Sequence, residues 1–145
     1  MTDRTGHCMC GAVSFSAVGM SDEFSACHCK MCQRWTGSFF KGVSVATENL
    51  AITGSENVTV IDSSNFAERA HCSKCGSAIW WRLTAGPHVG KTSVALGLLD
   101  DTDGLTLSRE YFVDYKNSTN VLPDDRIQMT EADVTAILAE FASEV

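Results

Sequence analysis

Seven cysteines are the residues of this 145-residue chain whose type and spacing most clearly indicate chemistry. They fall into three groups with none outside them: Cys8-Met9-Cys10, Cys27-His28-Cys29-Lys30-Met31-Cys32 and Cys72-Ser73-Lys74-Cys75. An odd number of cysteines cannot be fully paired in internal disulfides. In an intracellular chain, cysteines clustered at such short spacings more often bind metal or do chemistry. The clusters therefore predict metal binding.

Counting ligands divides the cysteines into a closed and an open site. Structural zinc takes four ligands in a tetrahedron, and two cysteine pairs distant in sequence would provide them. The predicted structural ligands are Cys8, Cys10, Cys72 and Cys75. Cys27, Cys29 and Cys32 remain, within six residues of one another. They would hold a second ion and leave its fourth position to water or substrate, as in catalytic zinc sites.

The charge of the open site favours a thiolate as its fourth ligand. Zinc with three thiolates carries a net negative charge and is a weaker Lewis acid than zinc held by neutral histidines. We therefore expect it to hold a substrate sulfur rather than to generate hydroxide. Lys30, Arg34 and Lys41 are close enough in sequence to offset the charge, although solvated surface positions are the simpler interpretation. His28 is a rival for the fourth position, but it lies between two ligands, which disfavours its binding to the same ion and leaves it a role beside the site.

Other interpretations of the clusters stay open at this point. Iron in a four-thiolate site is chemically allowed, so the sequence does not separate it from zinc. Cys72 and Cys75 also have the spacing of a redox dithiol, but no βαβ pattern surrounds them. Buried cysteines without metal would not be expected at these spacings. Zinc is the default interpretation.

The elements that must position these residues are mostly short strands. Period-two alternation of β-branched and aromatic residues predicts strands near residues 13–15, 39–45, 50–52, 58–60, 79–83, 94–98 and 110–113. Ile79, Trp81 and Leu83 are expected on one face. Many strands followed by a single clear helix predict a mainly-β domain rather than a βαβ fold.

The clear helix is at the C terminus, over about residues 130–144. Thr130 is a good N-cap, and Asp133 three residues later completes a box-like arrangement. An apolar stripe at helical spacing is expected to pack on the β core. Its members are Val134, Ile137, Leu138 and Phe141.

Length and charge limit the classes of function. A chain of 145 residues indicates a single domain, here taken as residues 1–145. No apolar run approaches the ~20 residues that span a bilayer, and the first residues lack a signal pattern, so we expect a cytoplasmic protein without a membrane partner. The net charge of −7 disfavours nucleic-acid binding. The sequence leaves the oligomeric state open, and a homo-oligomer is compatible with it.

The segments that carry the cysteines resemble one known family. The matching segments are Cys8-Met9-Cys10-Gly11-Ala12-Val13, Cys27-His28-Cys29, Cys32-Gln33-Arg34-Trp35-Thr36-Gly37, His71-Cys72-Ser73-Lys74-Cys75-Gly76 and Tyr111-Phe112-Val113-Asp114-Tyr115-Lys116. Together they resemble the GFA family, that of glutathione-dependent formaldehyde-activating enzyme, also called the CENP-V/GFA domain. The resemblance leaves the tail from Asn117 onward unmatched.

The resemblance implies a mainly-β fold of the β-tent type, built from short antiparallel strands, with two Zn²⁺ ions per chain. It implies the same division of the cysteines as the ligand count, with Cys27, Cys29 and Cys32 at the catalytic ion. The family's founding activity is that of S-(hydroxymethyl)glutathione synthase, a carbon–sulfur lyase that condenses glutathione with formaldehyde. The implied partners are therefore a small thiol and an aldehyde, with glutathione as the expected substrate.

Four residues around the open site are candidate substrate contacts: His28, Trp35, Thr36 and Lys41. Trp35 is equally well interpreted as a core residue. The alternative function is a non-catalytic zinc-binding module, with both ions structural, that binds a thiol or a protein partner. A fourth protein ligand at the second ion would favour that alternative.

Overall fold

The computed structural model of the chain describes residues 1–120, 122 and 124–142. Two α-helices lie in this part of the chain, α1 (Lys30–Thr36) and α2 (Glu131–Ala142). Its strands are β1 (Thr2–His7), β2 (Ser14–Met20), β3 (Glu23–Cys27), β4 (Phe40–Ala46), β5 (Leu50–Thr53), β6 (Val58–Ser64), β7 (Ala67–Cys72), β8 (Ala78–Leu83), β9 (Lys91–Ala95), β10 (Thr106–Tyr111) and β11 (Ile127–Met129). The predicted mainly-β class with a C-terminal helix is confirmed.

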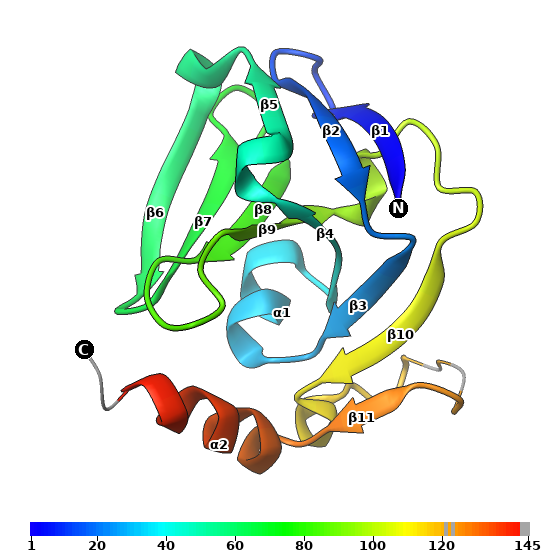
Figure 1. Cartoon of the computed structure of the whole chain (residues 1–145), viewed down its shortest axis with the longest axis vertical. Coiled ribbons are helices and arrows are strands. Elements are labelled where there is room, and N and C mark those ends of the chain that lie inside the picture. Colours follow the sequence, from blue (N-terminus) through cyan, green and yellow to red (C-terminus); the bar gives the residue numbers. More distant parts are fainter. Residues whose placement is uncertain (121, 123, 143–145) are drawn as a thin grey trace.

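The strands form two sheets. A small sheet has the order β1-β2-β5, and a large one has the order β11-β10-β3-β4-β9-β8-β7-β6. Most neighbours are antiparallel, but β10 runs parallel to both β3 and β11. Figure 1 shows the small sheet at the top, with β11 and α2 along the bottom edge beneath β10. The large sheet therefore carries both β3 and β7, the two strands that end in cysteine clusters.

Several elements lack the sequence signals on which the predictions rested. The inward residues of β1 are Arg4 and Gly6, so this strand has no apolar alternation. Only Ala26 is fully buried in β3. The helix α1 has seven residues, about two turns, which is too short for a recognisable apolar stripe. None of these three elements was predicted, although two of them carry cysteines of the open site.

The predicted common face of Ile79, Trp81 and Leu83 is wrong, because Ile79 and Trp80 are both buried. The pairing of β8 with β7 shifts its register at this point, which leaves an extra residue in β8. Such a bulge moves the residues that follow it to the opposite face of the sheet. The extra residue is Ile79, four residues after Cys75, just where the chain leaves the cysteine turn.

The strand predicted over residues 94–98 is also shorter than expected. The strand β9 stops at Ala95, and Leu96–Leu98 form a 3-10 turn. The turn closes through a hydrogen bond from the amide of Leu99 to the carbonyl of Leu96. Leu96 and Leu98 continue the apolar alternation past the end of the strand, because the turn that contains them also packs against the core.

The C-terminal helix begins as predicted. Oγ1 of Thr130 accepts a hydrogen bond from the amide of Asp133, and Oδ2 of Asp133 accepts one from the amide of Thr130. This reciprocal arrangement satisfies two amides that the helix itself cannot pair. In the predicted apolar stripe Val134 is buried, and Ile137 and Leu138 are half-buried. The side chain of Phe141 and residues 143–144 lie outside the described part of the chain.

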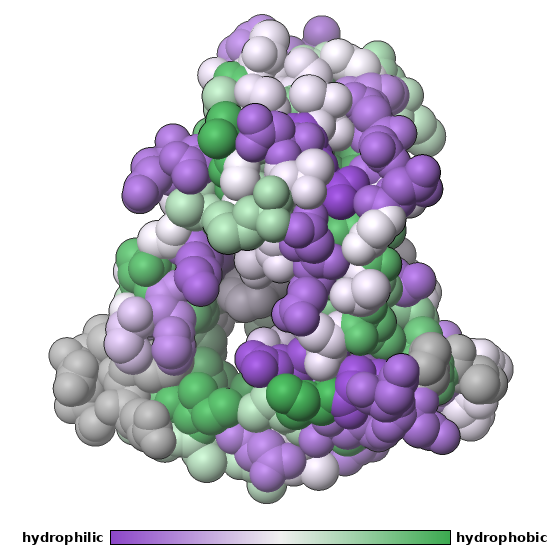
Figure 2. Space-filling view, turned by 45° about the vertical axis from the view of Figure 1, so that its right-hand side comes forward, coloured by the Kyte–Doolittle hydropathy of each residue, from purple (hydrophilic) through white to green (hydrophobic). Residues whose placement is uncertain are grey.

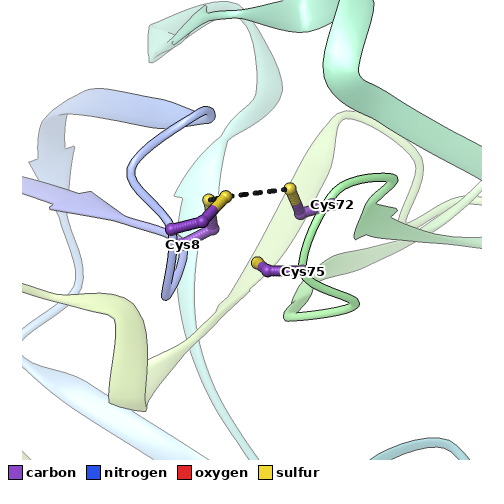
Figure 3. Close-up of side chains that lie close together, drawn as sticks. Cys8, Cys72 and Cys75 are labelled. Carbon is purple, nitrogen blue, oxygen red and sulfur yellow. Dashed lines mark hydrogen bonds between the residues drawn. The ribbon is translucent and has the colours of Figure 1, made fainter.

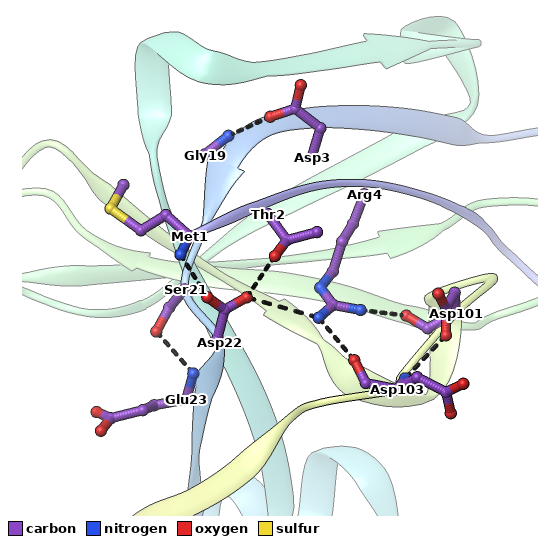
Figure 4. Close-up of polar contacts among 10 residues, drawn as sticks. All are labelled: Met1, Thr2, Asp3, Arg4, Gly19, Ser21, Asp22, Glu23, Asp101 and Asp103. Atoms are coloured by element: carbon purple, nitrogen blue, oxygen red, sulfur yellow. Dashed lines mark hydrogen bonds and ion pairs between the residues drawn. The ribbon is translucent and has the colours of Figure 1, made fainter.

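A buried arginine fixes the N-terminal strand. Arg4 donates from Nη1 to the carbonyl of Asp101, at 2.8 Å, and from Nη2 to that of Asp103, at 3.0 Å. Nη2 also lies 3.7 Å from Oδ1 of Asp22. Figure 4 shows these groups converging on the guanidinium from the turn before β10 and from the start of β3. The contacts hold β1 in place directly before the first cysteine pair.

Within the described residues, none of the helices combines the length and apolar character needed to cross a bilayer. Figure 2 shows a face on which polar and apolar residues are mixed, with a hollow near the middle of the molecule. The core lies between the two sheets and includes Cys8 and Cys72. Two of the cysteines are therefore part of the packed interior rather than of a surface loop.

Candidate metal centres

The first two cysteines meet the last two at one point between the sheets. Cys8 and Cys10 follow β1, Cys72 ends β7, and Cys75 lies in the turn that leads to β8. Their four Sγ atoms all lie within 4.8 Å of one another. Figure 3 shows Cys8 facing Cys72 and Cys75 across a common space, from opposite loops.

Tight glycine turns aim these sulfurs inward. Gly11 and Gly76 have positive φ angles of 75° and 78°, a conformation that favours glycine. The amide of Gly76 donates to the carbonyl of Cys72, at 2.8 Å, and the amide of Gly11 donates to that of Cys8, at 3.0 Å. The amide of Val13 donates to the Cys8 sulfur, at 3.3 Å. Both turns thus close tightly beside their cysteines, and in the first of them the amide of Val13 points at the Cys8 sulfur.

The spacing of the sulfurs suits a tetrahedral ion. Sγ of Cys10 lies 3.6 Å from that of Cys8 and 3.9 Å from that of Cys72. Four sulfurs at ~2.3 Å from a central zinc ion are about 3.8 Å apart. Hydrogen bonds from the hydroxyl and amide of Ser77 lower the pKa of Cys75 to about 5, which favours the thiolate that a metal ion needs. The donor set fits zinc.

The other three cysteines surround the start of α1. Cys27 ends β3, Cys29 is the N-cap of α1, and Cys32 lies in its first turn. The Cys29 sulfur accepts the amide of Cys32, at 3.3 Å, as a capping side chain does. The three Sγ atoms lie within 4.8 Å of one another, and among the described residues no further Cys, His, Asp or Glu joins them.

The three sulfurs of this group compete with one another for negative charge. The thiols of Cys27 and Cys32 donate to the Cys29 sulfur, which lowers the pKa of Cys29 to about 2. The interactions of Cys27 with the sulfurs of Cys29 and Cys32 raise the pKa of Cys27 far above its ordinary value. One sulfur is therefore ionised at the expense of its neighbours. A divalent cation would relieve that competition, and the set again fits zinc or another thiophilic ion.

A buried arginine lies against this group. Arg69, on β7, is 7% exposed, and its Nη2 donates to the Cys32 sulfur, at 3.4 Å. Sequence reasoning missed Arg69, which follows Cys32 by 37 residues. The three cations considered from sequence, Lys30, Arg34 and Lys41, are exposed.

His28 points away from the three sulfurs. Its side chain is fully buried, and its Nε2 lies 2.8 Å from Oε1 of Glu110. Glu110 is also fully buried and pairs with Arg126 and with Lys116, whose Nζ lies 3.3 Å away. Burial alone would raise the pKa of Glu110, but hydrogen bonds from His28, Arg126 and Lys116 hold it below its usual value. His28 therefore anchors the cysteine loop rather than joining the three sulfurs.

A cavity of about 420 Å³ opens beyond the C-terminal end of α1. Thr36 and Lys41 line it, together with Ser38, Phe39, Phe40, Ala78, Ala95, Leu96 and Gly97. Trp35 is not among the lining residues, because its ring stacks on Phe40, with 5.2 Å between the centroids. Of the four substrate contacts considered from sequence, Thr36 and Lys41 thus line the cavity, whereas His28 and Trp35 do not.

Comparison with known proteins adds an independent finding. The model of the GFA family, described as glutathione-dependent formaldehyde-activating enzyme, matches residues 3–115. An uncharacterized lyase of Schizosaccharomyces pombe is 35% identical over 86 residues, which are 59% of this chain and 62% of that protein. A Halomonas elongata protein, provisionally named glutathione-dependent formaldehyde-activating enzyme, is 29% identical over 83 residues, 52% of this chain and 53% of that protein.

These matches span only about half to three fifths of the curated relatives. A solved structure of a Rhodobacter sphaeroides protein, a structural genomics target, has the same fold, with a TM-score of 0.56 and 22% identity. That similarity covers 87% of this chain and 99% of the other. The family match includes all seven cysteines but stops before β11 and α2.

Proposed function

This chain belongs to the GFA family, and we propose that it is a zinc-dependent carbon–sulfur lyase that joins a small thiol to a carbonyl compound. The expected pair is glutathione and formaldehyde, the compounds in the family's description. Relatives named as a lyase and as a formaldehyde-activating enzyme support the reaction class. The observation that carries the proposal is the group of three sulfurs that no fourth described side chain completes.

The four-cysteine group is assigned to structural zinc. Its proposed ligands are Cys8, Cys10, Cys72 and Cys75. Because Cys8 and Cys72 are buried in the core between the two sheets, an ion held there would tie the small sheet to the large one. Structural zinc is worth about 10–16 kcal/mol in small modules, enough to decide whether such a domain folds.

The three-cysteine group is assigned to the reactive ion. Cys27, Cys29 and Cys32 would hold zinc, which when bound stabilises a thiol as its thiolate in a fixed orientation. The chain itself contributes by restricting the movement of the cysteine sulfurs. Cys29 is fixed as a helix cap and Cys32 is packed inside, so two of the three sulfurs have little freedom.

The reaction forms one carbon–sulfur bond. The thiol sulfur attacks the carbonyl carbon of formaldehyde, and the carbon–oxygen double bond becomes single. The oxygen takes up one proton, which balances the proton that the thiol lost. The product is the S-hydroxymethyl thioether, and the reverse reaction regenerates thiol and aldehyde. Lys41 and Thr36 line the cavity at the C-terminal end of α1, and the exposed ammonium of Lys41 would attract a carboxylate of glutathione.

The test must separate catalysis from the reaction that occurs without protein. We expect exchange NMR on an equilibrated mixture of glutathione and formaldehyde to show faster interconversion when the zinc-loaded chain is added. Cys29→Ser should return the exchange rate to that of the uncatalysed mixture, whereas Ser16→Ala, at an exposed position of β2, should not. Exchange that stays at the uncatalysed rate with fully loaded wild-type protein contradicts the proposal.

A further inference from the structure

We propose that Arg69 makes the three-cysteine site select an anionic thiolate over a neutral fourth ligand. This inference rests on the proposed function, since it concerns the same site, and it assigns a specificity-determining role to a residue outside the cysteine motifs. Arg69 is the charged side chain that contacts a sulfur of the group, through Nη2 and Sγ of Cys32.

The guanidinium is held from three sides. Nη1 donates to Oγ of Ser63, at 2.5 Å, and to Sδ of Met31, at 2.8 Å. The carbon at its centre lies 5.4 Å from the centroid of the Trp35 ring. Because arginine presents donors in a rigid planar fork, these contacts fix where its charge lies relative to Cys32. Trp35 thus has a defined role behind the cavity, as the platform for this cation.

The charge of Arg69 is not compensated locally. Within the described residues no carboxylate lies at ion-pair distance from it, and its neighbour Glu68 pairs with Arg82 instead. Its buried Nε also has no hydrogen-bond partner. A buried cation without an anion is costly, so the natural counter-charge is the anionic cysteine group itself.

This arrangement discriminates between ligands by charge. Zinc with three thiolates is already negative, and a fourth thiolate adds another negative charge, which water screens less at a half-buried site than on an open surface. Arg69 offsets that charge from a fixed position next to Cys32. A neutral ligand such as water or imidazole gains nothing comparable. The fourth position should therefore prefer a thiolate because of Arg69.

Arg82 provides a matched control. It lies on β8, the strand next to β7, and its guanidinium stacks on Trp80, at 4.4 Å, much as that of Arg69 stacks on Trp35. It differs in having a carboxylate partner, with Nε 2.5 Å from Oε1 of Glu68, and in contacting no cysteine. Arg82→Met removes an equivalent charge and stacking contact away from the site.

The experiment uses the full chain loaded with Co²⁺, whose visible absorption reports its ligands. The probes are 2-mercaptoethanol, a thiol without a carboxylate, and imidazole, a neutral ligand. Arg69→Met should weaken 2-mercaptoethanol binding by about tenfold to a hundredfold, the range for a hydrogen bond to a charged group, with cobalt content unchanged. Imidazole binding should change by less than about threefold, and Arg69→Lys should keep most of the thiol affinity.

Arg82→Met should leave both affinities at wild-type values. If Arg69→Met does not fold, Arg69→Gln removes the same charge and keeps polar contacts to Ser63. Equal thiol affinity in wild type and the neutral variants, or an equal loss for thiol and imidazole, overturns the role of Arg69. Wild-type protein whose spectrum does not respond to 2-mercaptoethanol overturns the proposed thiol site itself, whatever the variants do.

Discussion

Nε2 of His28 lies 2.8 Å from Oε1 of Glu110, and both side chains are fully buried. His28 is the residue between Cys27 and Cys29, whereas Glu110 comes 82 residues later, on β10. Glu110 is paired in turn with Arg126, from the segment beyond the family match. The loop that carries two cysteines of the open site is thus tied to the C-terminal part of the chain through one carboxylate.

Glu110→Ala should destabilise the protein by about 3–5 kcal/mol, because it removes the buried carboxylate that pairs with the buried Arg126 and the half-buried Lys116. Urea unfolding followed by tryptophan fluorescence measures the change. Glu23→Ala, at an exposed position of the neighbouring strand β3, should change the unfolding free energy by less than ~0.5 kcal/mol. Equal effects of the two substitutions would mean that the buried network contributes little.

The same carboxylate predicts a pH dependence. The pKa of Glu110 is lowered in the folded protein, so its ionised form contributes stability above the unfolded pKa, about 4.5, and that stability is lost as the pH falls through the folded value. His28, Lys116 and Arg126 face the carboxylate, and Asp124 faces Arg126. The difference in unfolding free energy between wild type and Glu110→Gln should therefore shrink from about pH 5 toward about pH 3. If the difference in unfolding free energy stays constant or grows over this interval, Glu110 does not stabilise the fold as an ionised carboxylate.

Two glycines should respond differently to a methyl group. Gly54 has a φ of +79°, and a Cβ there would lie 2.0 Å from the carbonyl oxygen of Ala12, in the loop after Cys10. Gly54→Ala should cost about 2 kcal/mol or more, through the left-handed conformation and the backbone clash. Gly97→Ala, where nothing lies within 4 Å, should stay within ~0.5 kcal/mol. Thermal unfolding compares the two, and a harmless Gly54→Ala would be inconsistent with this loop geometry.

Substitutions in the two cysteine groups should have unequal consequences. Cys72→Ser should lose one zinc ion and lower the melting temperature strongly, because Cys72 is buried in the core between the sheets. Cys29→Ser should also lose one ion but melt close to wild type, since Cys29 is partly exposed. Elemental analysis counts the ions and distinguishes zinc from iron. A Cys29→Ser variant that keeps both ions contradicts the division into two sites.

The sequence was most informative about structures that are formed by residues close together in the chain. Cysteine spacing predicted which sulfurs each turn would bring together, because short-range contacts determine the geometry of a single turn. Joining the two distant pairs at one ion depended on counting ligands. Most strands predicted from apolar alternation were found, although Val60 in β6 is exposed. The strand predicted over residues 110–113 ends at Tyr111, and the buried residue of β10 is the charged Glu110. The bulge in β8 shows a further limit of the alternation signal. The capping box of α2 was predictable for the same reason, because it depends only on two residues that are three positions apart.

The residues that support the open site were not predictable in this way. Arg69 reaches Cys32 only because β7 lies beside α1, and Glu110 reaches His28 only because β10 pairs in parallel with β3. Both are charged residues inside strands that no cysteine spacing or apolar pattern singles out, so a single sequence presents them as ordinary surface charges. Their burial follows from strand order in the large sheet, which the local pattern does not contain.

The proposed open site is tested most directly by counting the sulfur ligands of zinc. X-ray absorption at the zinc edge, on the fully loaded chain, should give about 3.5 sulfurs per ion, the mean of a four-sulfur and a three-sulfur site. Addition of glutathione should raise the mean to about 4 sulfurs per ion. A mean of 4 before glutathione is added, or one that glutathione leaves unchanged, would contradict an open position that takes a substrate thiol.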